Sequence, residues 1–186
     1  YCIQNGELSP AEQVASPNFS ERPVGVAIDL VVVHSISLPP GDYGSGAIQR
    51  FFCNRLDSSE HSYFEEIAGL RVSAHALIER SGKVTQFVNF DCRAWHAGRS
   101  AHEGREECND FSVGIELEGA DYDVFEEEQY QSLAALIIAL ESSYEGVTTE
   151  RIVGHSDIAP GRKTDPGTGF DWQRLGREIA RLKAAL

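Results

Sequence analysis

The stretch VAIDLVVVH, residues 26 to 34, places the tightest constraint on how this chain can fold. Its β-branched and apolar side chains follow one another with almost no polar break, and such a run is typical of a strand buried at the centre of a sheet. The residues that follow, SISLPPGDYGSG, are rich in turn formers and predict a loop, with residues 39 to 46 as a candidate for motion. The sequence therefore predicts a central strand with His34 at its end.

Two further segments predict more strands. Residues 73 to 90 contain two apolar stretches separated by SGK, which predicts a hairpin that turns at those three letters. In residues 111 to 119 the side chains alternate, so the apolar ones would share one face of a strand. Gly114, Glu116 and Glu118 would lie on the other face, which then carries two carboxylates.

Helical spacing appears in three places. Residues 47 to 56 have the spacing of a short helix, and residues 126 to 144 begin with acidic side chains that suit a helix N-terminus and continue with apolar ones at helical intervals. A last helix is expected from Asp171, a suitable N-cap. Its apolar stripe consists of Trp172, Leu175, Ile179 and Leu182. We therefore expect one domain over residues 1–186, of the α+β class with α/β-like character, in which helices flank a central mixed β-sheet.

The charge balance restricts the partners of the chain. With a formal net charge of −13 it would repel nucleic acids and anionic surfaces. No apolar run approaches the roughly 18 residues that a membrane span needs. We therefore expect no nucleic acid and no membrane contact, no protein partner is implied, and a small or mobile substrate fits best.

The cysteines bear on the cellular compartment and on one class of chemistry. They show no C-x-x-C pair, and a chain of 186 residues folds without disulfides, so we expect free thiols and a reducing, cytoplasmic compartment. The four are Cys2, Cys53, Cys92 and Cys108. The first residues lack the features of a secretory signal, although a signal removed before Tyr1 stays open. A thiol hydrolase is a further alternative, but no cysteine lies in a context that marks an activated nucleophile.

The loop GHSDIAPGRKTDPG, residues 154 to 167, gathers several chemically active side chains. Its glycines and prolines make a regular helix unexpected, so we expect an irregular loop that follows a short strand in RIV. The letters GRKT lack the glycine and lysine spacing of a phosphate-binding Walker loop. His34, His155 and Asp165 suit a catalytic zinc site, which commonly takes three protein ligands. Spacing alone leaves open that the two histidines are packed or hydrogen-bonded residues.

The remaining histidines have ordinary interpretations. His61, His96 and His102 stand in polar or loop-like contexts, so we expect them on the surface or at the rim of a substrate site. His75 falls in an alternating strand and is expected as a hydrogen-bonded interior group.

Several long motifs, in one order and spanning most of the chain, resemble the AmpD-type family of 1,6-anhydro-N-acetylmuramyl-L-alanine amidases. They are VVVHSISLPP, GLRVSAHALIERSGKVTQFV, RAWHAGRS, CNDFSVGIELEG and GHSDIAPGRKTDPG. The resemblance implies a zinc-dependent, cytoplasmic hydrolase of cell-wall recycling. It also implies the fold shared with phage T7-type lysozyme amidases and peptidoglycan recognition proteins, a central mixed sheet with helices packed on it.

Carried over position by position, the resemblance assigns the reaction centre. It implies one Zn²⁺ per chain, held by His34, His155 and Asp165, with Glu116 as the catalytic glutamate and Lys163 as the catalytic lysine. The strand pattern alone leaves Glu116 and Glu118 as equal candidates, and the resemblance selects Glu116. Glu116 would move the proton of a zinc-activated water, and Lys163 would stabilise the developing oxyanion.

The resemblance also implies a set of substrate contacts. Tyr63 matches the binding tyrosine, and Trp95, Arg71 and Arg162 match further contacts to the substrate. From the residues alone, Trp95 is as suited to packing as to stacking on a sugar, and each arginine is as suited to an acidic residue of this chain as to a substrate carboxylate. Ser35 departs from the asparagine that many relatives carry after the first histidine ligand.

The function that the resemblance implies is hydrolysis of the lactyl amide between 1,6-anhydro-N-acetylmuramic acid and the L-alanine of a stem peptide, so the substrate would be an anhydro-muropeptide. The alternative is a catalytically inactive module of the same fold that binds peptidoglycan fragments. Binding-only members typically lack a metal ligand, and His34, His155 and Asp165 are all present. The amidase is therefore the favoured interpretation.

Overall fold

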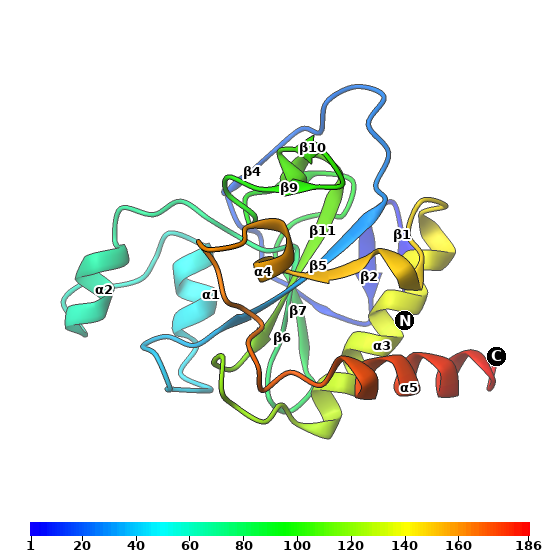
Figure 1. The fold of residues 1–186 in the computed structure, drawn as a ribbon. Helices are drawn as coiled ribbons and strands as arrows, with labels where there is room; N and C mark the ends of the chain where they lie inside the picture. Colours follow the sequence, from blue (N-terminus) through cyan, green and yellow to red (C-terminus); the bar gives the residue numbers. More distant parts are fainter.

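The computed structural model describes residues 1–186 and has a six-stranded mixed sheet at its centre (Figure 1). The spatial order is β12-β5-β11-β6-β7-β3. Neighbouring strands run parallel except for the antiparallel pair β6 and β7. The bounds are β3 Glu12–Gln13, β5 Leu30–Ile36, β6 Ala76–Ile78, β7 Val84–Gln86, β11 Ser112–Glu118 and β12 Ile152–Gly154. The predicted mixed sheet is thereby confirmed.

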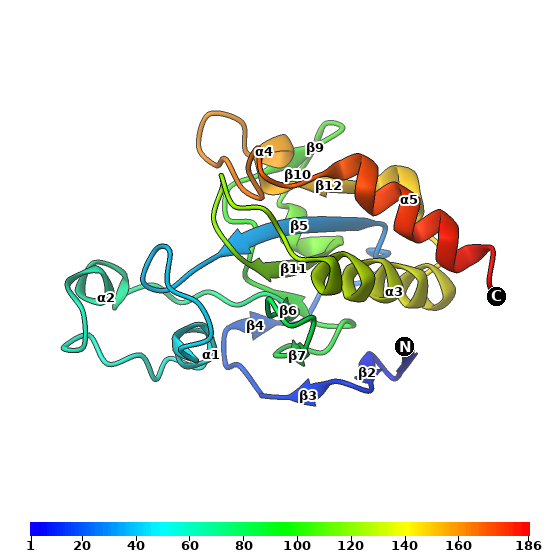
Figure 2. The same cartoon turned by 90° about the horizontal axis from the view of Figure 1, so that it is seen from below.

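Helices cover both faces of this sheet (Figure 2). The long helices α3 (Glu127–Ser143) and α5 (Trp172–Lys183) pack on each other and on one face. The short helices α1 (Ala47–Phe52), α2 (Ser62–Ile67) and α4 (His155–Ile158) belong to the opposite face. Neither the long nor the short helices combine the length and apolar character needed to cross a membrane.

Small elements complete the chain. Three two-stranded pairs join β1 Cys2–Gln4 to β2 Glu7–Ser9, β4 Phe19–Ser20 to β8 Arg93–Ala94, and β9 Ala101–His102 to β10 Arg105–Glu106. Two 3₁₀ turns, Cys108–Asp110 and Thr149–Arg151, precede β11 and β12. The four cysteines are free thiols, as expected.

The two faces of β5 and β11 differ in chemistry. On one face, Val31 and Val33 of β5 join the largest core cluster beneath α3 together with the apolar residues of β11. Leu30 and Val32 point to the other face and contact a smaller cluster that includes Ile158 of α4. Because side chains alternate along a strand, His34 projects on this second face. The predicted alternation in β11 is confirmed by the same division.

The predicted helices are present with changed ends. The helix of residues 126 to 144 is α3, and the last helix begins as predicted after Asp171, whose side chain accepts a hydrogen bond from Arg174 N at 2.9 Å. The helix of residues 47 to 56 ends early, at Phe52, because the chain turns at Asn54 in a left-handed conformation (φ 57°). Trp172 is only partly packed, against Phe170, and 39% of it is exposed.

Two expectations about the chain around the histidines were wrong. The first strand begins at Leu30 and runs to Ile36, so His34 lies within it, because its ladder with β11 pairs Leu30 with Ser112 and continues to Ile36 and Glu118. The loop after β12 opens with one helical turn, α4. The Asp157 carboxylate caps this turn by accepting a hydrogen bond from Gly154 N at 2.7 Å.

Candidate active site

The register of three parallel strands brings the predicted reaction centre together. In the ladder between β5 and β11, Glu116 lies beside His34. In the ladder between β12 and β5, Gly154 lies beside Val33, so His155 arrives next to His34. The carboxyl ends of parallel strands are where sheets of this kind bind ligands.

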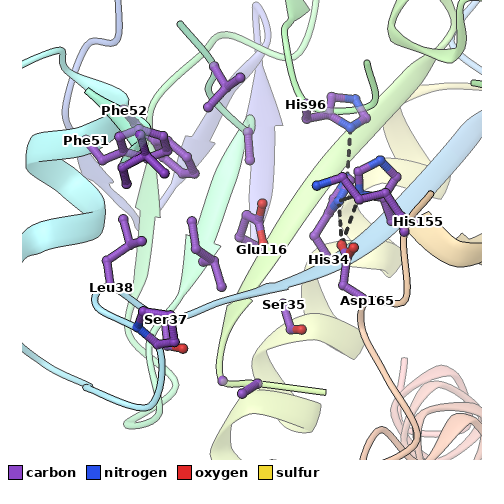
Figure 3. Close-up of a pocket in the computed structure, with 18 of the residues that line it drawn as sticks. His34, Ser35, Ser37, Leu38, Phe51, Phe52, His96, Glu116, His155 and Asp165 are labelled. Carbon is purple, nitrogen blue, oxygen red and sulfur yellow. Dashed lines mark hydrogen bonds and ion pairs between the residues drawn. The ribbon is translucent and has the colours of Figure 1, made fainter. Parts of the chain in front are cut away.

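Three donor atoms converge at this edge (Figure 3). The Nδ1 atoms of His34 and His155 are 2.9 Å apart, and they lie 3.1 and 3.0 Å from Oδ2 of Asp165. The two rings are buried and the carboxylate is half-buried. Asp165 reaches them because the loop turns back, with Ser156 N donating to the Asp165 carbonyl at 3.0 Å.

The outward nitrogen of each ring has its own hydrogen-bond partner. Nε2 of His155 donates to the Ala97 carbonyl at 3.0 Å, and Nε2 of His34 lies 2.9 Å from Nδ1 of His96. Burial lowers the pKa of His34 to about 4 and that of His96 well below its usual value, so both rings are neutral at neutral pH. Two imidazole nitrogens and a carboxylate that face one point fit the donor set of a catalytic zinc.

Glu116 faces the same space from β11. Its Oε2 is buried without a hydrogen-bond partner. Burial, reinforced by the charge of Asp165, raises the pKa of Glu116 well above its usual value, and Lys163 opposes this shift. A carboxyl group held in this way suits proton transfer, because its pKa is moved toward the working pH. Lys163 is exposed and lines the same cavity.

Glu118 has a different task. Its buried carboxylate accepts hydrogen bonds from Gly44 N at 2.6 Å and from Arg80 N at 3.3 Å. These bonds tie the loop of residues 39 to 46 to the sheet, and a hydrogen bond from Tyr43 to Asp123 adds a second tie. Of the two carboxylates that the sequence left open, only Glu116 lines the cavity.

The cavity has a volume of about 520 Å³, within the range of small-molecule sites. It extends from the donor triad to an apolar end formed by α1 and α2, where Phe51, Phe52 and Ile67 lie. Tyr63 lines this end, and Trp95 lines the cavity while its Nε1 donates to Ser20 Oγ at 3.3 Å. Ser35 also lines the cavity.

The two predicted arginines lie outside the lining of this cavity. Arg71 is exposed and donates to the carbonyls of Ala68 and Leu70, both at 3.1 Å. Arg162 donates to the carbonyls of Ala97 and Arg99, both at 2.7 Å. Neither forms an ion pair with an acidic residue of the chain, so the alternative in which they hold such a residue was wrong.

His96 lines the cavity, in agreement with its expected place at the rim of a substrate site, but nothing in the sequence indicated its contact with His34. The structure places its ring against His34, with ring centroids 5.0 Å apart. The sequence did contain one indication that a side chain packs closely on this strand, namely Gly114, because a glycine inside a strand often marks the close approach of another group. A Cβ at Gly114 would lie 2.3 Å from the His96 ring. His75 is buried as predicted, with Gly114 N donating to its Nδ1 at 3.0 Å.

The fold and this site define a class. A mixed sheet that brings two histidines, an aspartate and a half-buried glutamate together near the carboxyl ends of parallel strands offers the donor set and the carboxylate that metal-dependent hydrolases use. The chain belongs to the N-acetylmuramoyl-L-alanine amidase family, whose model matches residues 24–168. The resemblance in the sequence motifs and the expected amidase class are thereby confirmed.

Relatives and solved structures agree with this assignment. The chain is 52% identical over 172 residues to the 1,6-anhydro-N-acetylmuramyl-L-alanine amidase AmpD of Haemophilus influenzae, covering 92% of this chain and 94% of that protein. A crystal structure of a selenomethionine derivative of AmpD matches with a TM-score of 0.94 and 49% identity, over 96% of this chain and 99% of the other.

A more distant match contains a substrate. The amidase AmiD from E. coli, in complex with the substrate anhydro-N-acetylmuramic acid-L-Ala-D-γ-Glu-L-Lys, matches with a TM-score of 0.60 and 27% identity. The match covers 87% of this chain and 65% of AmiD. These structures confirm the expected fold class.

Proposed function

We propose that this protein is a zinc-dependent N-acetylmuramoyl-L-alanine amidase. It hydrolyses the lactyl amide between 1,6-anhydro-N-acetylmuramic acid and the L-alanine of a stem peptide. The observation that carries the proposal is the convergence of His34, His155 and Asp165 within 2.9–3.1 Å, beside Glu116, in one cavity. Identity of 52% to an AmpD enzyme supports the choice of substrate.

Zinc would be held by Nδ1 of His34, Nδ1 of His155 and a carboxylate oxygen of Asp165. When bound, zinc lowers the pKa of water from about 15.7 toward about 7 and polarises a carbonyl. The two rings are held in place by the bonds from their outward nitrogens, so the protein orients both ligands before the ion arrives.

Glu116 moves the proton of the reaction. It takes a proton from the attacking water as the new C–O bond forms, and it delivers that proton to the amide nitrogen of L-alanine as the C–N bond breaks. The products are the lactyl carboxylate and the free amino group of the peptide. The raised pKa of Glu116 supports this role, because a carboxylate with a higher pKa takes up the proton of the water more readily and can then act as the acid.

Lys163 stabilises the charge that develops on the carbonyl oxygen. Lys163 stands on the loop that also carries Asp165, and it lines the cavity. A donor in this place strengthens its hydrogen bond as the oxyanion forms, which lowers the barrier selectively.

The substrate contacts are assigned to four residues. Tyr63 and Trp95 line the cavity and present aromatic surface to the sugar and the peptide. Arg71 and Arg162 bind carboxylates of the stem peptide from outside the cavity lining. Each donates to backbone carbonyls through one terminal nitrogen, which leaves the other for the substrate.

We further propose a cytoplasmic role in cell-wall recycling. The four free cysteines suit a reducing compartment. Imported turnover fragments carry the anhydro sugar, and intact wall polymer is absent from that compartment. The alternative of an inactive binding module is less well supported, because all three ligand residues and Glu116 are present.

One experiment tests metal and bond together. Purified protein is assayed for zinc and then incubated with anhydro-muramyl tripeptide, the same peptide on reducing N-acetylmuramic acid, and intact sacculi, with the products identified by mass spectrometry. We expect about one zinc per chain and fastest release of the L-alanine-headed peptide from the anhydro substrate. Equal or faster release from sacculi would overturn the recycling role alone. No release from any substrate would overturn the amidase assignment.

A further inference from the structure

A chain of hydrogen bonds leads away from the proposed metal site through residues outside the ligand set. Nε2 of His34 lies 2.9 Å from Nδ1 of His96. Nε2 of His96 lies 3.2 Å from the hydroxyl of Ser112, and that hydroxyl lies 2.6 Å from the carbonyl of Cys108. Ser112 and Cys108 are fully buried, so water does not compete for these bonds.

The position of every proton in this series of hydrogen bonds follows from its last acceptor, the Cys108 carbonyl. The Cys108 carbonyl only accepts, so the single proton of the Ser112 hydroxyl lies between those two oxygens. The hydroxyl then offers His96 only lone pairs, and the His96 proton lies on Nε2. Nδ1 of the neutral His96 ring is therefore an acceptor. His34 donates to this acceptor when its own proton lies on Nε2. In that tautomer Nδ1 of His34 carries a lone pair.

We infer that His96 is a positioning residue for the metal site, which holds His34 in the tautomer and ring orientation that present Nδ1 to the ion. The inference deepens the proposed function and rests on the zinc site proposed there. His96 is not one of the three donor residues, and His34 is the one member of the triad to which it is hydrogen-bonded.

The backbone around His96 supports the second histidine ligand. The Asn109 side-chain oxygen accepts hydrogen bonds from His96 N at 3.1 Å and from Ala97 N at 2.8 Å. The Ala97 carbonyl in turn accepts from Nε2 of His155 at 3.0 Å. One short segment, fixed by the buried Asn109, thus positions the outward nitrogens of both metal-binding rings. Outer partners of this kind typically contribute about 10- to 100-fold to metal affinity.

The first test needs neither a variant nor a metal. Long-range ¹H–¹⁵N NMR on zinc-free, ¹⁵N-histidine-labelled protein reports which ring nitrogen carries the proton. We expect Nε2 to be protonated in both His34 and His96. A proton on Nδ1 of His34 in the folded zinc-free protein would overturn the inference, whatever the protein then does with zinc.

The second test measures zinc affinity by competition with a chromophoric chelator. His96→Leu removes the acceptor and is expected to weaken zinc binding about 10- to 100-fold, whereas His96→Asn, whose amide oxygen can accept from His34, is expected to retain most of the affinity. His102→Asn is the matched control, because His102 lies on β9 and contacts no ligand residue. Circular dichroism confirms that each variant is folded at the assay temperature.

The outcomes separate the two proposals. A parent protein that fails to bind zinc removes the proposed metal site itself. A parent that binds zinc, together with a folded His96→Leu variant of equal affinity, removes only the role of His96. Equal losses in His96→Leu and His96→Asn would also overturn it, because the acceptor would then not be the feature that matters.

Discussion

Gly114→Ala tests how closely the proposed metal site depends on the position of the His96 ring. A Cβ at this position would lie 2.3 Å from Cγ, 2.4 Å from Nδ1 and 2.6 Å from Cδ2 of His96. Ordinary contact begins at 3.4 Å, so the ring must withdraw by about 1 Å. The bond between His96 and His34 is 2.9 Å long and would not survive that movement.

Two losses are expected from this one methyl group. Overpacking a dense interior destabilises by about 1–3 kcal/mol, which urea unfolding of the zinc-free protein measures. Displacing the His96 ring is expected to lower zinc affinity about 10- to 100-fold, measured by chelator competition. Gly176→Ala is the matched control, because its Cβ would meet nothing within 4 Å on helix α5. It should stabilise the protein by about 0.5–1 kcal/mol and leave zinc affinity unchanged.

A double-mutant cycle identifies the ring as the cause. In a His96→Ala background the space left by the imidazole can receive the new methyl group, so Gly114→Ala should cost less there than in the parent protein. The coupling is expected to reach about 0.5–3 kcal/mol, since the two residues are in contact. Additive effects, or a folded Gly114→Ala variant with the zinc affinity of the parent, would refute the reasoning.

Three further predictions concern the acidic residues and Lys163. Glu116→Gln and Lys163→Ala should each keep zinc and fold but lose about 100-fold or more in turnover, and a greater loss in Glu118→Gln would contradict the assignment. Asp165→Asn should lose zinc, measured by metal analysis after dialysis, and retention of one zinc per chain would exclude it as a ligand. Because the pKa of Glu116 is raised in the folded protein, the protonated side chain contributes to stability in full below the pKa of the unfolded chain. This contribution is lost as the pH rises through the folded-state pKa. Glu116→Gln should therefore raise the Tm of zinc-free protein more at about pH 8 than at about pH 4, and the opposite trend would contradict the burial argument.

The parts of the fold that the sequence predicts are those whose signal is local. The long helix α3 and the last helix α5 carry their own periodicity, and Asp171 caps α5 as its position suggested. The hairpin of β6 and β7 turns through Gly82, which has a positive φ of 80° that glycine adopts without strain. Each of these features depends on residues that are neighbours in the chain.

The features that the sequence does not predict depend on distant partners. The residues at which β5 begins and ends are set by its pairing with β11, and no feature within residues 26 to 36 indicates where that pairing starts and stops. His96 stands in RAWHAG, whose letters suggest a loop, and its neighbour His34 is far away in the sequence. The resemblance to a family selected His34, His155, Asp165 and Glu116 as candidates, but it gave no account of which contacts hold these side chains in place.

One face of β11 shows why register matters more here than any single side chain. Ser112 fixes the proton of His96, Gly114 leaves room for its ring, Glu116 faces the cavity, and Glu118 anchors the loop of residues 39 to 46. All four lie at alternate positions of the strand. Because a slip of one residue turns every side chain to the opposite face, it would remove the support, the space, the carboxylate and the anchor together. The apolar residues between them, buried under α3, therefore protect the chemistry by fixing the register.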